Sequence, residues 1–351
     1  MTQTLRPAIA PVTAHRLRAR LMWLLVCVIA LAAVVAASLA LGARDIPLAR
    51  VFEAFTGTAT GETDHLVVLE QRLPRTLVGI LVGAALGLAG TLMQGITRNP
   101  LADPGLLGVN AGASLFVVLA IATLGVTSPA GYIWFAFAGA AAATVVVYGV
   151  AAVGRGGATP VKLALAGMAL TAGVTSVLTL VLLTDTTAMS TYRFWAVGSL
   201  AGRGAAGTAD TLGAVAPFLA VGAVLAFACS RWLNVLSMGD ELAHGLGVHV
   251  PRARALSMLA AVLLAGSATA LAGPIAFVGL VVPHLIRPLT GPDYRWILAY
   301  ALVLGPTLLL AADVVGRLIA QPGELEAGLV VALLGAPVMI AIVRKAKVAG
   351  L

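Results

Sequence analysis

The chain has 351 residues, of which 60% are hydrophobic and only 10% are charged. Soluble domains carry about a quarter charged residues, so water is not the main solvent of this chain. The net charge of +8 does not indicate nucleic-acid binding, because the basic residues gather in alternate loops between apolar runs. Cys27 and Cys229 both lie inside apolar runs, which excludes a disulfide framework and a cysteine-based metal site.

Apolar stretches bounded by proline, glycine and charged residues predict an all-α, polytopic membrane protein with about ten transmembrane helices. A crossing helix needs roughly 20 apolar residues, because the hydrocarbon core is about 30 Å thick. The predicted spans are 21–42, 76–94, 106–125, 131–154, 163–184, 211–230, 255–272, 275–289, 296–315 and 326–343. Pro274 and Pro283 are expected to break the helical hydrogen bonding, so that the eighth span is short and broken.

Residues 21–345 form one predicted transmembrane domain, with cytoplasmic tails at 1–20 and 346–351. Ten spans place both termini on one side of the membrane. With that side in the cytoplasm, 15 lysines and arginines lie inside and seven outside, as the positive-inside rule requires. A cleaved signal peptide is the alternative for the first span, but its apolar run is longer than a signal core and many similar runs follow.

The sequence lacks the common motifs of soluble enzymes. It has no GxxxxGK[ST] for a nucleotide, no HExxH for zinc and no GxSxG elbow, so energy for transport would come from an ion gradient or another polypeptide. An ion-coupled carrier usually keeps ionisable residues in mid-span. Asp313 and His284 are the nearest examples, but both lie toward span ends. Asp313 and Arg317, one helical turn apart, predict a structural ion pair.

Two local patterns predict packing and a short helix. Gly83, Gly87 and Gly90 share one helix face, which favours close approach of a neighbouring helix in a bilayer. Residues 237–248 combine helix-start residues with glycines that would end the helix. They predict a short cytoplasmic helix on which a soluble motor could push, with a solvated loop as the alternative.

A series of motifs follows in order from about residue 70. They are RLPRT at 72–76, GTLMQ at 90–94, NPLADPGLLG at 99–108, GDELA at 239–243, GPIAFVGL at 273–280, PH at 283–284, ADVVGR at 312–317 and GAPV at 335–338. In this order they closely resemble the BtuC/FecCD-type permease family of vitamin B12 and iron-siderophore ABC importers. The amino-acid sequence at 97–104 and 108–114 is most similar to that of ferric catecholate siderophore permeases of the enterobactin type.

The resemblance implies a permease in the inner membrane of a bacterium, with ten helices per subunit. The pore would need a second permease subunit, either an identical copy or a related chain. Two ABC ATPase subunits would bind ATP and magnesium at the inner face, while this chain would bind no cofactor and no metal. A periplasmic or lipoprotein substrate-binding protein would deliver the substrate from outside. We expect a ferric siderophore as substrate, with haem and then cobalamin as alternatives and an ion-coupled secondary carrier as the rival class.

The resemblance also assigns roles to individual residues. At the outer mouth, Arg72, Arg75 and Arg317 would dock the binding protein, with helix-end anchoring as the alternative for Arg72 and Arg75. At the inner face, the coupling segment 237–254 would contact the ATPase, with Asp240 and Glu241 on its exposed side. Its matching positions are Gly239, Asp240, Glu241, Leu242, Ala243, Gly245 and Gly247. The positions that would narrow the inner end of the pathway are Asn99, Leu101, Thr159, Pro160 and Val161, with an ordinary loop as the alternative for 159–161.

Overall fold

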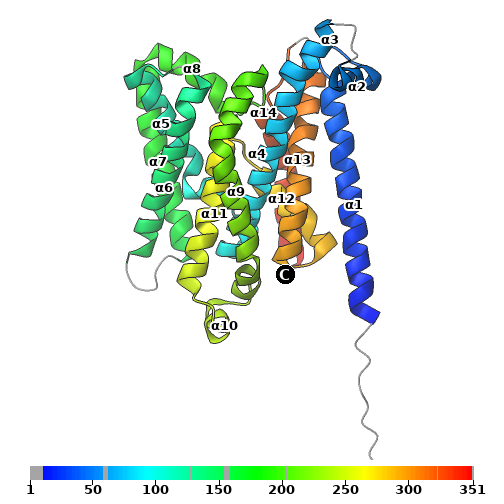
Figure 1. Cartoon of the computed structure of the whole chain (residues 1–351). Helices are drawn as coiled ribbons and strands as arrows, with labels where there is room; N and C mark the ends of the chain where they lie inside the picture. Colours follow the sequence, from blue (N-terminus) through cyan, green and yellow to red (C-terminus); the bar gives the residue numbers. More distant parts are fainter. Residues whose placement is uncertain are drawn as a thin grey trace, which may run out of the picture.

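The computed structural model describes residues 11–57, 62–126, 128–153, 159–202, 204–321 and 323–349, and within these ranges the chain contains helices and no strands. Within these ranges, ten helices overlap the ten predicted spans one by one (Figure 1). Their bounds are α1 Pro11–Ala40, α4 Leu73–Thr97, α5 Val109–Leu124, α6 Pro129–Ala152, α7 Pro160–Thr184, α9 Gly204–Leu236, α11 Val250–Ala272, α12 Val278–Thr290, α13 Tyr294–Ile319 and α14 Ala327–Ala349. Seven are long and apolar enough to cross a membrane, and α5, α12 and α14 are shorter apolar helices.

Short elements lie at the two ends of this bundle. They are α2 Leu48–Thr56, α3 Glu62–Leu66, the π-helical turn η1 Val67–Arg72, the 3-10 turn η2 Pro104–Leu107, α8 Thr186–Ala196 and α10 Asp240–Gly245. Figure 1 shows α2, α3 and α8 at one end and α10 at the other. Helix α1 begins and α14 ends at the α10 end, so both termini leave the bundle on the face that carries α10.

Two helices extend beyond the predicted ends of the transmembrane domain. Helix α1 begins at Pro11, so the predicted tail 1–20 is partly helical, and α14 continues to Ala349 beyond the predicted domain end at 345. The early turns of α1 are held in place because Arg20 donates a hydrogen bond of 2.6 Å to the carbonyl of Thr290 in α12. Charged residues can stay helical at a membrane interface when their heads reach water or a carbonyl, so the helices continue past the charged residues that set the predicted ends. The division into a transmembrane domain and two tails stays a prediction.

The predicted break at Pro283 is wrong, although Pro274 does lie in the extended stretch between α11 and α12. Helix α12 runs through Pro283 without interruption. A proline leaves the carbonyl four residues earlier without its helical donor, here the carbonyl of Gly279. The Gln94 amide of α4 lies 3.5 Å from that oxygen and 3.2 Å from the carbonyl of Leu280, so a side chain from a neighbouring helix replaces the missing backbone donor.

Helix α4 is the centre of the bundle and packs against α9, α11, α12 and α13. The predicted glycine face is confirmed. A Cβ atom at Gly83 would lie 2.6 Å from Cα of Pro306, and one at Gly87 would lie 2.9 Å from the carbonyl oxygen of Ala301. At Gly90 it would overlap the backbone of Gly279. Two helix backbones therefore meet α4 at van der Waals distance, as small residues permit in membrane proteins.

This packing predicts that Gly90→Ala destabilises the fold. The added methyl group would meet backbone rather than a flexible side chain, so we expect a loss of about 1–3 kcal/mol in the free energy of unfolding. The matched control is Gly213→Ala in α9, where a Cβ atom meets nothing within 4 Å. Thermal unfolding of the two purified variants in one detergent measures the difference, and equal melting temperatures would contradict the prediction.

Candidate functional site

The three arginines at 72, 75 and 317 converge at the outer end of the bundle, the end with α2 and α3. Arg72 ends η1, Arg75 lies in the first turn of α4 and Arg317 lies in the last turn of α13. Their exposed fractions are 6%, 8% and 2%, and Asp313 of α13 is 0% exposed. They are therefore buried in the chain, where a charged group requires a partner.

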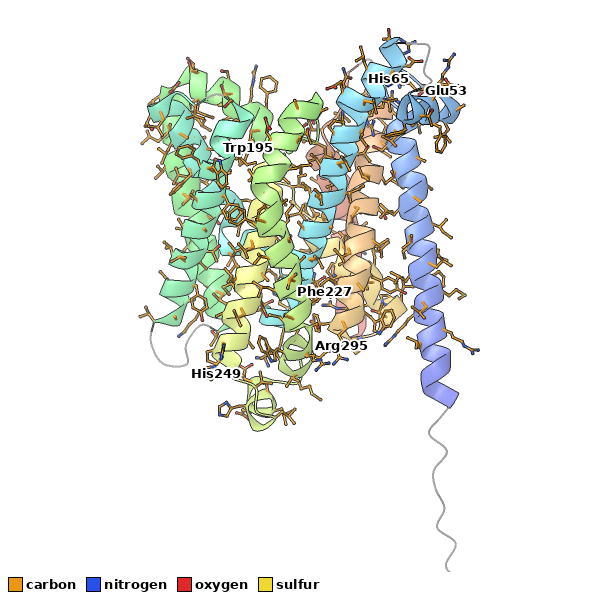
Figure 2. The ribbon with its side chains drawn as sticks, viewed as in Figure 1. Glu53, His65, Trp195, Phe227, His249 and Arg295 are labelled. Carbon is orange, nitrogen blue, oxygen red and sulfur yellow. The ribbon has the colours of Figure 1, made fainter. Side chains whose placement is uncertain are left out.

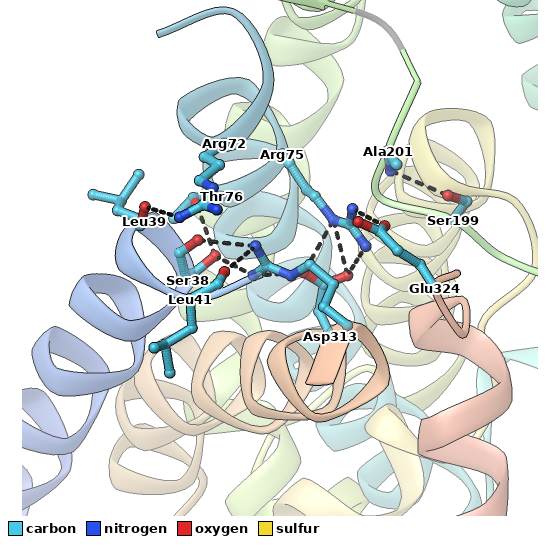
Figure 3. A network of polar contacts seen from close by, with 11 residues as sticks. Ser38, Leu39, Leu41, Arg72, Arg75, Thr76, Ser199, Ala201, Asp313 and Glu324 are labelled. Carbon is cyan, nitrogen blue, oxygen red and sulfur yellow. Dashed lines mark hydrogen bonds and ion pairs between the residues drawn. The ribbon is translucent and has the colours of Figure 1, made fainter. Parts of the chain in front are cut away.

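Asp313 supplies that partner for two of the arginines (Figure 3). Its Oδ1 accepts a hydrogen bond of 2.9 Å from Arg75 Nη2, and its Oδ2 lies 3.1 Å from Arg317 Nη2. The predicted ion pair between Asp313 and Arg317 is thus confirmed. Glu324 adds a second carboxylate, with Oε2 2.5 Å from Arg75 Nη1. The network joins α4, α13 and the segment after α13.

The other donors of these arginines hold the end of α1. Arg317 Nη1 donates to the carbonyls of Ser38 at 3.0 Å and Leu41 at 3.1 Å. Arg72 donates to the carbonyls of Leu39, at 2.8 Å, and Arg44. The last carbonyls of a helix lack intrahelical donors and carry partial negative charge, so guanidinium groups stabilise them. Helix-end anchoring, the alternative role of Arg72, is therefore visible in the structure.

A hollow of about 650 Å³ opens beside this network. Its charged lining residues are Arg44, Arg72, Arg75, Arg317, Glu70 and Glu324. Basic side chains outnumber acidic ones in this lining. Arg72 also has no carboxylate within ion-pair distance among the described residues. The outer hollow is therefore suited to an acidic group, and the docking role of the three arginines stays a prediction.

At the opposite end, the predicted short helix is present as α10, Asp240–Gly245. Glycine is required on both sides of it, because Gly239 and Gly247 have φ of +113° and +80°. Ala243 is buried against the bundle, whereas Glu241, Leu242 and Gly245 face away from it. The helix thus presents one side to a partner, although its contact with an ATPase stays a prediction.

The Asp240 side chain is 41% exposed, as the prediction of an exposed side for Asp240 and Glu241 allows, but it also has partners that the sequence did not indicate. Its Oδ1 lies 3.2 Å from Nη2 of Arg98, and its Oδ2 lies 2.9 Å from Nη2 of Arg254. Arg98 follows α4 with φ of +50°, and Arg254 belongs to the first turns of α11. Asp240 therefore ties α10 to two helices of the bundle. Sequence reasoning missed these pairs because the arginines belong to other segments.

The predicted pathway residues have local structural roles. Asn99 Oδ1 accepts a hydrogen bond of 2.9 Å from the backbone N–H of Leu101. Thr159 caps α7, with Oγ1 3.4 Å from the backbone nitrogen of Lys162, while Pro160 is the first residue of α7 and Val161 is exposed. A threonine cap followed by proline is a common helix start, so this geometry agrees with the ordinary-loop alternative. A role in the pathway stays a prediction for all five residues.

Two further observations concern the chemistry of the loops. Burial raises the pKa of the Asp103 carboxyl in the loop after α4, while the hydrogen bond from the backbone N–H of Gly105, 2.8 Å long, opposes this change. This carboxylate caps η2.

In the part of the chain that the structure describes, no group of three or more His, Cys, Asp or Glu side chains is arranged to hold a metal ion.

The outer network predicts that Asp313→Asn destabilises the chain, because two buried guanidinium groups lose a shared charge. Removing one partner of a buried ion pair costs about 3–5 kcal/mol. We expect a loss of about 3 kcal/mol in the free energy of unfolding, because Glu324 still pairs with Arg75. Glu53→Gln, which breaks an exposed pair with Arg50, should cost less than about 1 kcal/mol. Thermal unfolding of both variants provides the measurement, and an equal loss in the two would contradict a buried network.

Comparison with known proteins agrees with this architecture. The chain is 48% identical over 311 residues to the ferric enterobactin transport system permease protein FepD of Escherichia coli, covering 88% of this chain and 91% of FepD. It is 38% identical over 309 residues to the hemin transport system permease protein HmuU of Yersinia pestis, covering 85% and 90%. A solved structure of a metal-chelate type ABC transporter in an inward-facing conformation matches with a TM-score of 0.79 and 27% identity, over 93% of this chain and 99% of that chain.

The family is shown by the extent of the match as well as by these relatives. Residues 28–345 match the FecCD transport family, which spans the bundle from α1 to α14. The match includes the outer arginine network and the α10 segment. The chain therefore belongs to the FecCD transport family, whose members are membrane permeases of ABC importers that work with a separate ATPase and a substrate-binding protein.

Proposed function

We propose that this chain is the permease subunit of an importer that moves a ferric siderophore across the inner membrane of a bacterium. The identity of 48% with a ferric enterobactin permease supports this substrate class. Two ABC ATPase subunits, which bind ATP with magnesium, supply energy from ATP hydrolysis, and a second permease subunit, identical or related, completes the pore. A periplasmic or lipoprotein binding protein delivers the substrate. Both termini and α10 lie in the cytoplasm, in keeping with the 15 basic residues assigned to that side.

The observation that carries this proposal is the construction of α10. It is a short helix with an exposed acidic side, bounded by glycines and tied to α4 and α11 through Asp240. A partner that pushes on Glu241 and Leu242 would move α10 together with the inner ends of these two helices. Segment 237–254 therefore acts as the coupling segment, through Gly239, Asp240, Glu241, Leu242, Ala243, Gly245 and Gly247.

Alternating access follows from the way in which α4 spans the bundle. ATP binding closes the two ATPases, and each draws its α10 inward. Because α4 packs closely against its neighbours, it moves as a rigid element and transmits the displacement to its outer end at Arg75. Asn99 and Leu101 follow α4, and 159–161 form the start of α7, where such a tilt would widen or narrow the inner end of the pathway.

The first test of this function is Glu241→Lys. Reversing the exposed charge of α10 should uncouple ATP hydrolysis by the ATPase from substrate uptake, because the helix no longer fits its acceptor. We expect uptake into proteoliposomes to fall at least about tenfold while insertion of the permease is unchanged. Glu53→Lys, on exposed α2 at the opposite end, is the matched control. Normal uptake by Glu241→Lys would remove the coupling role of α10.

The outer arginines are proposed to receive an acidic surface of the binding protein. Arg75 and Arg317 share Asp313, so Arg72 has the most charge to offer to a partner. Reversing all three would disrupt the buried network and the fold with it. A neutral substitution of Arg72 therefore separates docking from stability better than charge reversal of the whole set.

Arg72→Gln should slow association of the binding protein about threefold to tenfold at low salt, because rim charges act mainly on the rate of encounter. The difference from wild type should shrink as salt rises. Arg50→Gln on exposed α2 is the control, since Arg50 lies outside the outer hollow. Surface plasmon resonance at two ionic strengths gives the association rates. An unchanged rate for Arg72→Gln would leave Arg72 as an anchor of α1 alone.

Haem import is the second candidate function, because the hemin permease of Yersinia pestis is 38% identical to this chain. Cobalamin import has no comparable support among these relatives, and an ion-coupled carrier would need titratable groups in mid-span. Uptake of a ferric catecholate siderophore and of haem by the complete transporter, measured in competition, distinguishes the two. Preferred uptake of haem would overturn the siderophore assignment and leave the importer mechanism in place.

A further inference from the structure

A second polar hollow, of about 320 Å³, lies at the inner face beside α10. It is lined by Gln94, Arg98, Pro100, Ser237, Arg287, Pro292 and Tyr294. These residues come from the inner ends of α4, α9, α12 and α13, and Ser237 immediately precedes the turn into α10. The hollow thus adjoins the proposed coupling helix without including any residue of it.

The charges around this inner hollow are unbalanced. Arg287 lies half-buried in the last turn of α12, and no carboxylate of the described chain lies within ion-pair distance of it. Arg98 is the other cation of the lining, and it shares Asp240 with Arg254. Asp293, in the loop after α12, is engaged by Asn234 at 2.8 Å and by the backbone N–H of Arg295 at 3.1 Å. The lining therefore holds two guanidinium groups and no acidic side chain.

A partly desolvated guanidinium without a counter-charge is unfavourable, so such a position favours binding of an anion. One more polar group of the lining lacks a partner. Gln94 is 1% exposed and uses its amide nitrogen on α12, but its Oε1 accepts no hydrogen bond from the described residues. The lining therefore contains a buried acceptor without a donor as well as an arginine without a counter-charge.

The position of the inner hollow decides which kind of anion can reach it. Helix α4 is surrounded by α9, α11, α12 and α13, so its inner end lies within the cross-section of the bundle rather than at the perimeter that lipid covers. A phospholipid headgroup at the rim would have to leave the bilayer to enter. An occupant therefore arrives from the aqueous side, the same side to which α10 presents Glu241 and Leu242.

We propose that this hollow receives a carboxylate side chain of the ATPase subunit, which Arg287 binds as a second contact beside α10. The inference rests on the proposed function, since it requires an ATPase at this face. Because Arg98 belongs both to the hollow and to the ion pair with Asp240, the incoming carboxylate engages the group that holds α10. The ATPase is thereby linked to α4 and α12 directly, in addition to its contact with the coupling helix.

The test measures the affinity of the ATPase for the full-length permease in nanodiscs, using Arg287→Gln and Arg287→Lys. We expect Arg287→Gln to weaken binding about tenfold, the size of a charge-assisted hydrogen bond, and Arg287→Lys to restore part of the loss. The weakening should decrease at high salt. Arg295→Gln is the matched control, because Arg295 is exposed and lies outside the hollow. It lies at the inner end of the molecule, as does His249, which precedes α11 (Figure 2). This substitution should change affinity less than twofold.

Thermal unfolding of each variant alone first establishes that it is folded. If Arg287→Gln is folded and binds the ATPase like wild type, the proposal is overturned. It is also overturned if the substitution abolishes binding of inorganic phosphate, or acts only in nanodiscs containing anionic lipid, while ATPase affinity stays constant. If wild-type permease fails to bind the ATPase at all, the proposed function itself fails, which is a different result from equal binding by wild type and variant.

Discussion

The structure depends on the close contact between α4 and the backbones of α12 and α13. Gly83 and Gly90 have no room for a Cβ atom, so the central helix is fixed against its neighbours by backbone packing rather than by side chains that can rearrange. Gln94, one turn beyond Gly90, completes the contact by donating to carbonyls of α12 near Pro283. A helix held in this way moves with its neighbours or not at all, which suits an element that carries a displacement through a bilayer.

Ion pairs at the two ends of α4 connect this rigid helix to α13 and to α10. Arg75 at its outer end meets Asp313 of α13, and Arg98 just beyond its inner end meets Asp240 of α10. The outer pair belongs to a network that also holds the end of α1, and the inner pair leads to a helix with an exposed side. One rigid element therefore connects the surface that we propose for an ATPase with the surface that we propose for a binding protein.

The sequence predicted those features that depend on neighbours along the chain. Spans follow from apolar length, the glycine face follows from helical spacing, and the pair of Asp313 with Arg317 follows from one turn of separation. It failed where a partner comes from a distant segment. Helix α12 continues through Pro283, where Gln94 of α4 lies beside the freed carbonyl, and Asp240 pairs with Arg98 and Arg254. Contacts between distant segments leave no periodic pattern in the sequence, so they could not be predicted from it.

Both faces use the same arrangement, in which one aspartate is shared by two arginines. Asp313 serves Arg75 and Arg317, and Asp240 serves Arg98 and Arg254. Asp313 and Asp240 thus each lie between two guanidinium groups. The inner cluster of Asp240, Arg98 and Arg254 has a net charge of +1, whereas Glu324 brings the net charge of Asp313, Arg75 and Arg317 to zero. Neighbouring arginines add positive charge in the outer and inner hollows. These two aspartates therefore hold helices together within the chain, while the arginines in excess line the outer and inner hollows, where we propose that acidic partners bind.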